Sequence, residues 1–258
     1  MQIPCYNYAA MFNCPEPGIS RYFLRKRYVD FPIALLLSLC ALPIVLVAWL
    51  LVRLTSRGPG IYKQVRLGQD GKPFTLYKIR TMWVNAEAAT GAVWATRHDK
   101  RVTRVGRFLR RTHIDELPQL YNVLRGDLSL VGPRPERPEF VTELEKRIDG
   151  YVYRLYVKPG LTGLAQLNQS SDTDLNDVRR KLVFDFEYLE NSSLWFDIRL
   201  LFCTVLAMLL LCPPMVLKLF RLYREAEKSY WAAALLPGNY SACDEERLSK
   251  IMTKQAVL

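Results

Sequence analysis

Two adjacent carboxylates directly follow a basic stretch of the chain, and these residues suggest chemistry most strongly. Asp115 and Glu116 come soon after Arg110 and Arg111. A proline two residues further on and a glycine at 126 predict that the acids open a short helix. Acids in a first helical turn often serve only as caps. Beside guanidinium groups, however, such a carboxylate stays ionised, and an ionised Asp can act as a nucleophile without a general base.

Three further cations lie in segments that suit phosphate binding. Arg134 stands between Pro133 and Pro135, which fix its backbone, and a guanidinium can bind phosphate through two parallel hydrogen bonds. A rigid surface turn would explain the prolines but not the arginine between them. Lys78 and Arg80 are two residues apart, so in a strand they share one face. The cations around the dyad therefore indicate an anionic substrate.

A basic run precedes the dyad and predicts a charged helix face. Residues 97–111 hold seven Lys or Arg in fifteen positions. Lys100, Arg104, Arg107 and Arg111 recur at three- and four-residue spacing, so we expect them on one side of a helix. The simplest interpretation is a solvated face that rests on anionic lipid.

Composition narrows the function classes. The chain has 258 residues, a formal charge of +11, two His and six Cys without a C-x-x-C pair. A disulfide framework, a structural zinc site and chemistry built on several histidines are thereby disfavoured. The positive charge alone would suit nucleic acid, but no nucleic-acid-binding motif is present, so we expect no nucleic-acid partner. Phosphorylated small molecules and phospholipid headgroups fit the charge better.

Two long apolar runs account for the high mean hydropathy of the chain. Residues 31–52 form 22 positions without a charge, long enough for a helix to cross a bilayer. Pro43 lies near the middle and predicts a bend. Both flanks are basic, which draws both ends toward the cytoplasm and favours a bent, re-entrant helix over a spanning one. Residues 200–217 form a second run, for which length does not separate a spanning, an interfacial and a buried helix.

Turn signals organise the rest of the chain. Alternating stretches at 61–66 and 74–79 flank Asp70 and Gly71 and predict a β-hairpin. Helical patterning dominates from about residue 101. We therefore predict a helix-rich α+β fold that is membrane-associated, with an N-terminal re-entrant helix, interfacial helices and a small β-hairpin.

Several of these segments together resemble one family. KRYVDFPIALLLSLCALP, YKIRTM, GRFLRRTHIDELPQLYNVLRGDLSLVGPRPE and KPGLTGLAQLN occur in the order and spacing of the bacterial monotopic phosphoglycosyl transferases, and the resemblance runs from about residue 25 to residue 197. The family transfers a sugar 1-phosphate from a nucleotide sugar to a polyprenyl phosphate. The match is most specific over residues 105–136.

The resemblance implies a reaction and roles for individual residues. Asp115 would attack a UDP-sugar, release UMP and carry a sugar-phosphoryl group that undecaprenyl phosphate then removes. Glu116 would be its dyad partner, and Mg²⁺ would sit at Asp115. The phosphate-binding residues would be Lys78, Arg80, Arg110, Arg111 and Arg134.

The resemblance also implies a place in the cell and a division of the chain. The enzyme would lie at the bacterial inner membrane, bound to anionic lipid, with its catalytic domain on the cytoplasmic face; a homodimer is left open. The predicted segments are a poorly ordered lead-in at 1–20, the re-entrant helix at 21–54, the catalytic domain at 55–199, a second apolar segment at 200–217 and a polar tail at 218–258.

Three departures from the family pattern mark where this chain differs. Leu42 precedes Pro43 where relatives often have Ser, Asn168-Gln169-Ser170 replaces a usual Asn-Gly-Arg, and the second apolar run is more continuous. The alternative function is a catalytically inactive membrane scaffold that binds anionic lipid and leaves UDP-sugars untouched.

Overall fold

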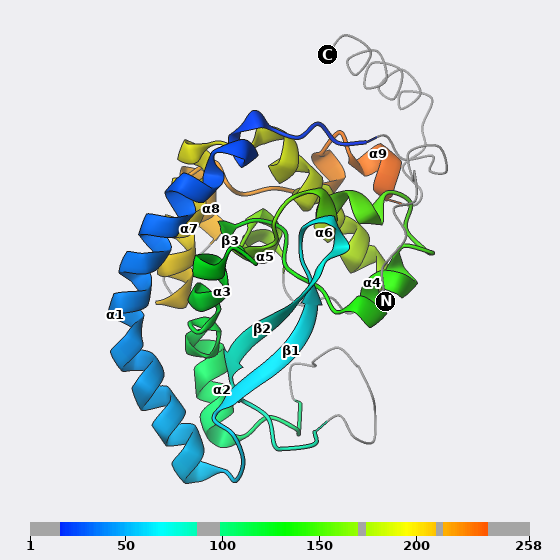
Figure 1. The fold of residues 1–258 in the computed structure, drawn as a ribbon. Helices are drawn as coiled ribbons and strands as arrows, with labels where there is room; N and C mark the ends of the chain where they lie inside the picture. The colour runs from blue at the N-terminus through cyan, green and yellow to red at the C-terminus, as the bar shows by residue number, and fades with distance from the viewer. Residues whose placement is uncertain (1–15, 87–98, 170–173, 210–213, 237–258) are drawn as a thin grey trace.

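The chain folds into a helix-rich α+β structure, as the sequence predicts. The computed structural model describes residues 16–86, 99–169, 174–209 and 214–236 (Figure 1). The α-helices are α1 (Lys26–Thr55), α2 (Arg104–Arg111), α3 (Gln119–Arg125), α4 (Pro138–Leu144), α5 (Leu164–Asn168), α6 (Leu175–Asn191), α7 (Leu194–Met208), α8 (Pro214–Leu219) and α9 (Ala232–Leu235). The strands are β1 (Ile61–Leu67), β2 (Pro73–Ile79), β3 (Ser129–Val131) and β4 (Gly160–Thr162). Short 3₁₀ turns are η2 (Arg21–Leu24), η3 (Gln69–Gly71), η4 (Ile114–Glu116), η5 (Tyr151–Tyr156) and η6 (Ala226–Lys228).

The apolar helix α1 is continuous for 30 residues, and Pro43 lies inside it. Figure 1 shows the helix bowed, with its convex side turned away from the rest of the molecule. A mid-helix proline removes one backbone hydrogen bond and crowds the preceding turn, so a bend is its expected effect. The prediction that the helix re-enters the membrane is not tested by this shape.

One narrow stripe of α1 packs against the protein. Ala34, Ala41, Ala48 and Val52 are at most 7% exposed and follow one another at spacings of seven, seven and four residues. Most large apolar side chains around the rest of the helix stay exposed, and they are Tyr28, Phe31, Leu35, Leu36, Leu37, Leu39, Leu42, Ile44, Leu46, Val47, Trp49, Leu50, Leu51 and Leu54. Within the described residues, α1 is the one helix long and apolar enough to cross a membrane. Only 17% of its most apolar window is buried, which is unlike the core helix of a soluble protein.

Both ends of α1 are fixed to the same body. At the N-terminal end, buried Lys26 pairs with Asp197 of α7 and lies 3.5 Å from Asp30, which accepts a hydrogen bond from Ser129 of β3. At the other end, the small apolar cluster of Ala48, Val52, Ile79 and Leu109 joins α1 to β2 and α2. The folded domain therefore lies alongside the helix over most of its length.

The predicted β-hairpin is confirmed. Strands β1 and β2 pair antiparallel, with Ile61 opposite Ile79 and Tyr62 opposite Lys78. The connection contains the predicted Asp70 and Gly71, both with positive φ. Such a turn suits Asp and Gly because their left-handed conformation costs little.

A second, parallel pair of short strands, β3 and β4, shapes the loop that carries Arg134. The backbones approach so closely that a Cβ on Gly160 would come within 2.0 Å of the Gly132 nitrogen. Hydrogen bonds from the Gly132 nitrogen to the Thr162 carbonyl and from the Gly160 nitrogen to the Pro133 carbonyl, both 2.8 Å long, hold the loop at this point. Only glycine permits this contact, which explains the glycines at positions 132 and 160.

The basic helix is shorter than the spacing of its charges predicts. Thr103 caps α2 through a 2.9 Å hydrogen bond from the Gly106 nitrogen, so Lys100 lies before the helix rather than on its face. Arg104, Arg107 and Arg111 are exposed, as expected. Arg97 lies outside the described residues.

The C-terminal part differs from the predicted polar tail. Leu222, Trp231, Leu235 and Leu236 are buried in the main core, so the chain continues to pack as far as residue 236. Their irregular spacing is the reason that periodicity did not reveal them. Residues 237–258 of that predicted tail lie outside the described residues.

The remaining segment predictions fall partly beyond the described residues. The second apolar run begins within α7, whose Leu200 and Cys203 are buried while Phe202 and Val205 are about half exposed. Residues 210–213 of this run lie outside the described residues, as do residues 1–15 of the predicted lead-in.

Candidate active site

The dyad occupies a 3₁₀ turn rather than the first turn of an α-helix. Asp115 and Glu116 end η4, and α3 begins only after Pro118, which is its N-cap residue. His113 precedes the turn in the left-handed region, with φ of 55°. Gly126, with φ of 89°, ends α3 as predicted. Because Asp and Glu are consecutive in a tight turn, their side chains leave it in different directions.

Glu116 is clamped between two cations. Lys78 Nζ lies 2.8 Å from Glu116 Oε1, and Arg134 donates to both carboxylate oxygens at 2.6 and 3.4 Å. The hairpin supplies the lysine and the loop after β3 supplies the arginine, so the dyad joins two parts of the fold. Although burial opposes it, the pair of Arg134 and Lys78 holds the pKa of Glu116 well below its usual range.

Asp115 is buried yet has no hydrogen-bond donor among the described residues. Its residue is 6% exposed. Burial raises the pKa of Asp115 to about 6, and the neighbouring Glu116 carboxylate adds to the rise. Positive charges on Lys78, Arg110 and Arg134 oppose it. The sequence predicts that the arginines keep Asp115 ionised. In the structure it is Glu116 whose pKa is lowered. Asp115 instead has a raised pKa and is a poorly solvated carboxyl without a hydrogen-bond partner among the described residues.

The structure separates the other predicted phosphate-binding residues. Arg110 acts on the charge of Asp115, and its Nε donates to Thr81 Oγ1 at 2.8 Å. Arg111, the next residue of the same helix end, is exposed. Arg80 has another task, because its guanidinium donates to the Arg57 and Ser56 carbonyls at 2.6 and 2.9 Å and so fastens β2 to the end of α1. Lys78, Arg110 and Arg134 thus act most strongly on the dyad, whereas neither Arg80 nor Arg111 forms a hydrogen bond or ion pair with it among the described residues.

Two residues that sequence reasoning missed lie close to this arrangement. Gln119 follows Asp115 by one turn, is 3% exposed, and its Nε2 has no partner among the described residues. Arg154 is also 3% exposed and donates to the Arg134 carbonyl at 3.0 Å. The buried polar character of Gln119 is visible only in a structure. Arg154 could have been suspected because it interrupts an otherwise aromatic and aliphatic stretch.

Comparison with known proteins gives a family match that covers the residues of this site. The family described as bacterial sugar transferase matches residues 21–210. The chain belongs to the bacterial sugar transferase family. The match contains the dyad, the hairpin and the Arg134 loop together with α1, so every residue described above at the site lies within the family domain.

Curated relatives of this sugar transferase differ in the sugar that they are named for. A UDP-glucose:undecaprenyl-phosphate glucose-1-phosphate transferase of Escherichia coli is 44% identical over 76% of this chain and 42% of its own length. A UDP-N-acetylgalactosamine-undecaprenyl-phosphate N-acetylgalactosaminephosphotransferase of Aeromonas hydrophila is 42% identical over 71% of this chain and 43% of its own. An undecaprenyl-phosphate galactose phosphotransferase of Salmonella typhimurium is 39% identical over 69% and 39%. The chain therefore spans less than half the length of these relatives.

The donor set around Asp115 fits a magnesium ion bound together with a substrate. Mg²⁺ usually takes only one or two protein carboxylates and completes its shell with phosphate oxygens and water. Asp115 offers one carboxylate without a competing hydrogen bond, whereas both Glu116 oxygens are engaged by cations. The described residues contain no cluster of three or more His, Cys, Asp or Glu. A metal here would need the diphosphate of the substrate as a further ligand.

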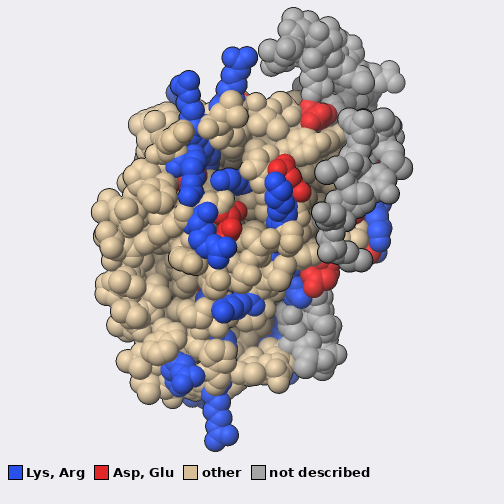
Figure 2. Space-filling view, viewed as in Figure 1, with Lys and Arg blue, Asp and Glu red and all other residues tan. Residues whose placement is uncertain are grey.

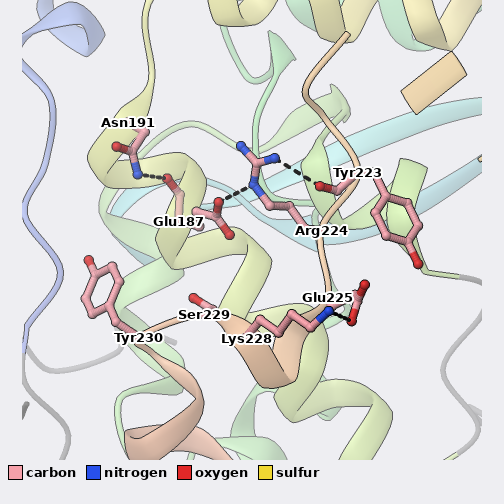
Figure 3. A pocket seen from close by; sticks show the side chains of 8 residues that line it. All are labelled: Glu187, Asn191, Tyr223, Arg224, Glu225, Lys228, Ser229 and Tyr230. Carbon is pink, nitrogen blue, oxygen red and sulfur yellow. Dashed lines mark hydrogen bonds and ion pairs between the residues drawn. The ribbon is translucent and has the colours of Figure 1, made fainter. Parts of the chain in front are cut away.

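A separate hollow on the protein does not share these properties. It lies between α6 and the segment after α8 and is lined by Glu187, Asn191, Tyr223, Arg224, Glu225, Lys228, Ser229 and Tyr230 (Figure 3). Arg224 pairs with Glu187, and Lys228 pairs with Glu225 at 2.7 Å. In the hollow each of these two cations is balanced by one carboxylate, whereas three cations, Lys78, Arg110 and Arg134, lie around the two carboxylates of the dyad. The hollow is therefore a weaker candidate for a diphosphate than the dyad.

The raised pKa of Asp115 predicts that the charge of this side chain destabilises the fold. An acid whose pKa is higher in the folded protein than its usual 3.8 costs stability as pH rises from about 4 to about 6, and the full cost remains above that range. Asp115→Asn should therefore raise the Tm in detergent at pH 7.5, by an amount corresponding to at most about 3 kcal/mol. The gain should shrink as the pH is lowered toward 4. Asp70→Asn, in the exposed hairpin loop, controls for the loss of one carboxylate, and an equal effect of both variants would contradict the burial argument.

Proposed function

We propose that this sugar transferase moves a sugar 1-phosphate from a UDP-sugar to undecaprenyl phosphate through a covalent intermediate on Asp115. The observation that carries the proposal is the unequal dyad. Glu116 is held by Lys78 and Arg134, while the buried Asp115 beside it has no hydrogen-bond donor among the described residues. An acceptor-only, poorly solvated carboxylate is a better nucleophile than one tied up in ion pairs.

The first step exchanges the phosphoanhydride bond of the UDP-sugar for an acyl phosphate bond to the enzyme. A carboxylate oxygen of Asp115 attacks the phosphorus that bears the sugar, the bond from that phosphorus to the bridging oxygen breaks, and UMP leaves with the electron pair. The enzyme then holds an acyl phosphate carrying the sugar. In the second step an oxygen of undecaprenyl phosphate attacks the same phosphorus, and the Asp115 carboxylate is released. The lipid-linked diphosphate sugar is the product, and no proton need be lost from Asp115 at a pH above about 6.

The cations around the dyad can balance the negative charges that this reaction brings together. The nucleophile, donor and acceptor are all anions, so phosphoryl transfer depends chiefly on positioning and electrostatic stabilisation. A guanidinium has five N–H donors, and Arg134, whose side chain is 36% exposed, uses two nitrogens on Glu116. Its remaining donors can bind a phosphate. Bound Mg²⁺ would neutralise phosphate charge, with Asp115 as the protein ligand.

The placement of α1 supports a protein that enters one leaflet and does not cross the bilayer. The stripe from Lys26 to Val52 contacts the same folded domain that holds the dyad, so a perpendicular spanning helix would draw polar residues into the hydrocarbon. The left edge of the molecule in Figure 2, which α1 forms, is free of Lys, Arg, Asp and Glu along its middle part. Basic residues flank the helix at both ends, which favours a position for both ends at the cytoplasmic face of the inner membrane. Anionic lipid would contact these residues, and the lipid acceptor would meet the dyad at the interface.

Loss of the Asp115 carboxylate should abolish both half-reactions. Purified protein incubated with Mg²⁺ and a panel of UDP-sugars (glucose, galactose, and their N-acetylated amines), labelled in the β-phosphate, should retain label and release UMP. Asp115→Asn should retain none. Normal turnover in that variant would exclude the nucleophile, and binding to anionic liposomes without UMP release from any UDP-sugar would favour the inactive scaffold. The sugar that gives the fastest release identifies the donor.

A matched pair of arginines on α2 tests the field at the dyad. Arg110→Met removes a charge that acts on Asp115 and should lower the rate of UMP release ~100-fold or more, the cost typical of losing one electrostatic contact to a reacting group. Arg107→Met removes an exposed charge one helical turn earlier and should change the rate by less than about threefold. Equal losses would mean that α2 acts through general attraction of anions instead.

Thiol labelling decides how α1 sits in the membrane. Tyr28 and Leu54 are 81% and 74% exposed near the two ends of the helix. In a background with only Cys40 retained, Tyr28→Cys and Leu54→Cys should both react with a membrane-impermeant maleimide in inverted vesicles and not in intact cells. Reaction of one on each side would show a spanning helix. Cys40, in the apolar middle of α1, should stay unlabelled in both preparations.

A further inference from the structure

A fully buried arginine lies beneath the loop that presents Arg134. Arg154 belongs to η5, is 3% exposed, and its guanidinium reaches three different partners. Nη2 lies 2.8 Å from Asp185 Oδ2 and donates to the Arg134 carbonyl at 3.0 Å. Nη1 donates to Tyr151 Oη at 2.7 Å. The planar fork thus joins α6, η5 and the loop after β3.

Burying these charges contributes little to the free energy of folding, which indicates a role beyond stability. A buried ion pair contributes little net stability compared with well-packed apolar residues of similar volume, because both charges lose their hydration. The pair of Arg154 and Asp185 is as deeply buried as the apolar core around it, with both side chains 3% exposed. What an apolar pair could not supply is the directed hydrogen bond to the Arg134 carbonyl.

The loop around Arg134 is held at every residue, and Arg154 is the side chain that holds Arg134 itself. Backbone bonds hold Gly132 and Pro133, and Arg66 donates to the Pro135 carbonyl at 3.1 Å. Glu136 at the end of the loop pairs with Lys181 at 2.6 Å and lies 3.9 Å from Arg154. A guanidinium that must meet the two oxygens of Glu116 depends on the placement of its own backbone, so a small shift here is passed to the dyad.

We infer that Arg154 is a positioning residue for the transfer reaction, which it supports by fixing the backbone of Arg134 and thereby the orientation of the Arg134 guanidinium toward Glu116 and the substrate phosphate. This inference rests on the proposed function. The described partners of the Arg154 guanidinium are Tyr151, the Arg134 carbonyl, Glu136 and Asp185, and neither acid of the dyad is among them. Its effect on the rate passes through Arg134.

A double-mutant cycle separates this role from a general effect on folding. Arg154→Lys keeps a positive charge for Asp185 but lacks the planar fork whose two nitrogens reach all three partners, and should lower kcat/KM for UMP release ~100-fold. In an Arg134→Lys background, where precise placement of the guanidinium is already lost, the same change should cost less than about threefold. Equal losses in both backgrounds would overturn the inference, because a purely structural role acts independently of residue 134.

Matched controls keep the outcome decisive. Arg179 also donates to two backbone carbonyls, those of Leu235 and Arg147, at 3.1 and 3.0 Å. Arg179→Lys should leave kcat/KM within about threefold of wild type in either background.

If Arg154→Lys does not fold, the same cycle is carried out with Tyr151→Phe, which removes one acceptor of the same guanidinium. This variant should show a smaller loss of kcat/KM, and the loss should vanish in the Arg134→Lys background. Full activity of Tyr151→Phe and Arg154→Lys would overturn the inference, whereas a wild-type protein without UMP release from any UDP-sugar would overturn the proposed function and the inference with it.

Discussion

The ion pairs of Glu116 with Lys78 and Arg134 are the interaction on which the site depends. They bring the end of the hairpin and the loop after β3 to the same point, with distances of 2.8 and 2.6 Å to one carboxylate oxygen. Their second effect falls on the neighbouring residue. Since the cations are occupied by Glu116, Asp115 is left with the cost of burial and the repulsion of an adjacent charge, and its pKa rises to about 6. In the proposed reaction, Glu116 organises the site and Asp115 is the residue that reacts.

The scaffold that supports this pair relies on close backbone contacts and buried charge. Gly132 and Gly160 let β3 and β4 approach so closely that the Arg134 loop is fixed by backbone hydrogen bonds. Arg154 and Asp185 stand behind the same loop. Asn122, fully buried, accepts a bond from the Tyr77 nitrogen and donates to the Thr75 carbonyl, so α3 grips β2 just before Lys78. Each anchor acts on the backbone next to a charged side chain, where a small displacement matters most.

Local sequence patterns predicted many elements of the fold, whereas contacts between segments distant in the sequence could not be predicted from it. The hairpin around Asp70 and the end of α3 at Gly126 follow from turn chemistry that involves only a few neighbouring residues. The types and spacing of residues also pointed to Asp115, Glu116, Lys78 and Arg134 as one site. The sequence could not show which acid pairs with the cations. That depends on how the η4 turn packs against β2 and the loop after β3, which are distant from it in the sequence. Arg80 shows the same limit: β2 ends at Ile79, and the next side chain turns to carbonyls of residues 56 and 57.

The small apolar cluster at the end of α1 connects the turn that carries Asp115 to this long apolar helix. Ile114, immediately before Asp115, packs against the group formed by Ala48, Val52, Ile79 and Leu109. Two of these four residues belong to α1. Trimming α1 away to obtain a water-soluble catalytic fragment would strip that turn of its support and open its apolar underside to solvent. The turn that carries Asp115 therefore depends on α1 for its packing, and the same helix serves both as the apolar anchor and as a support of the site.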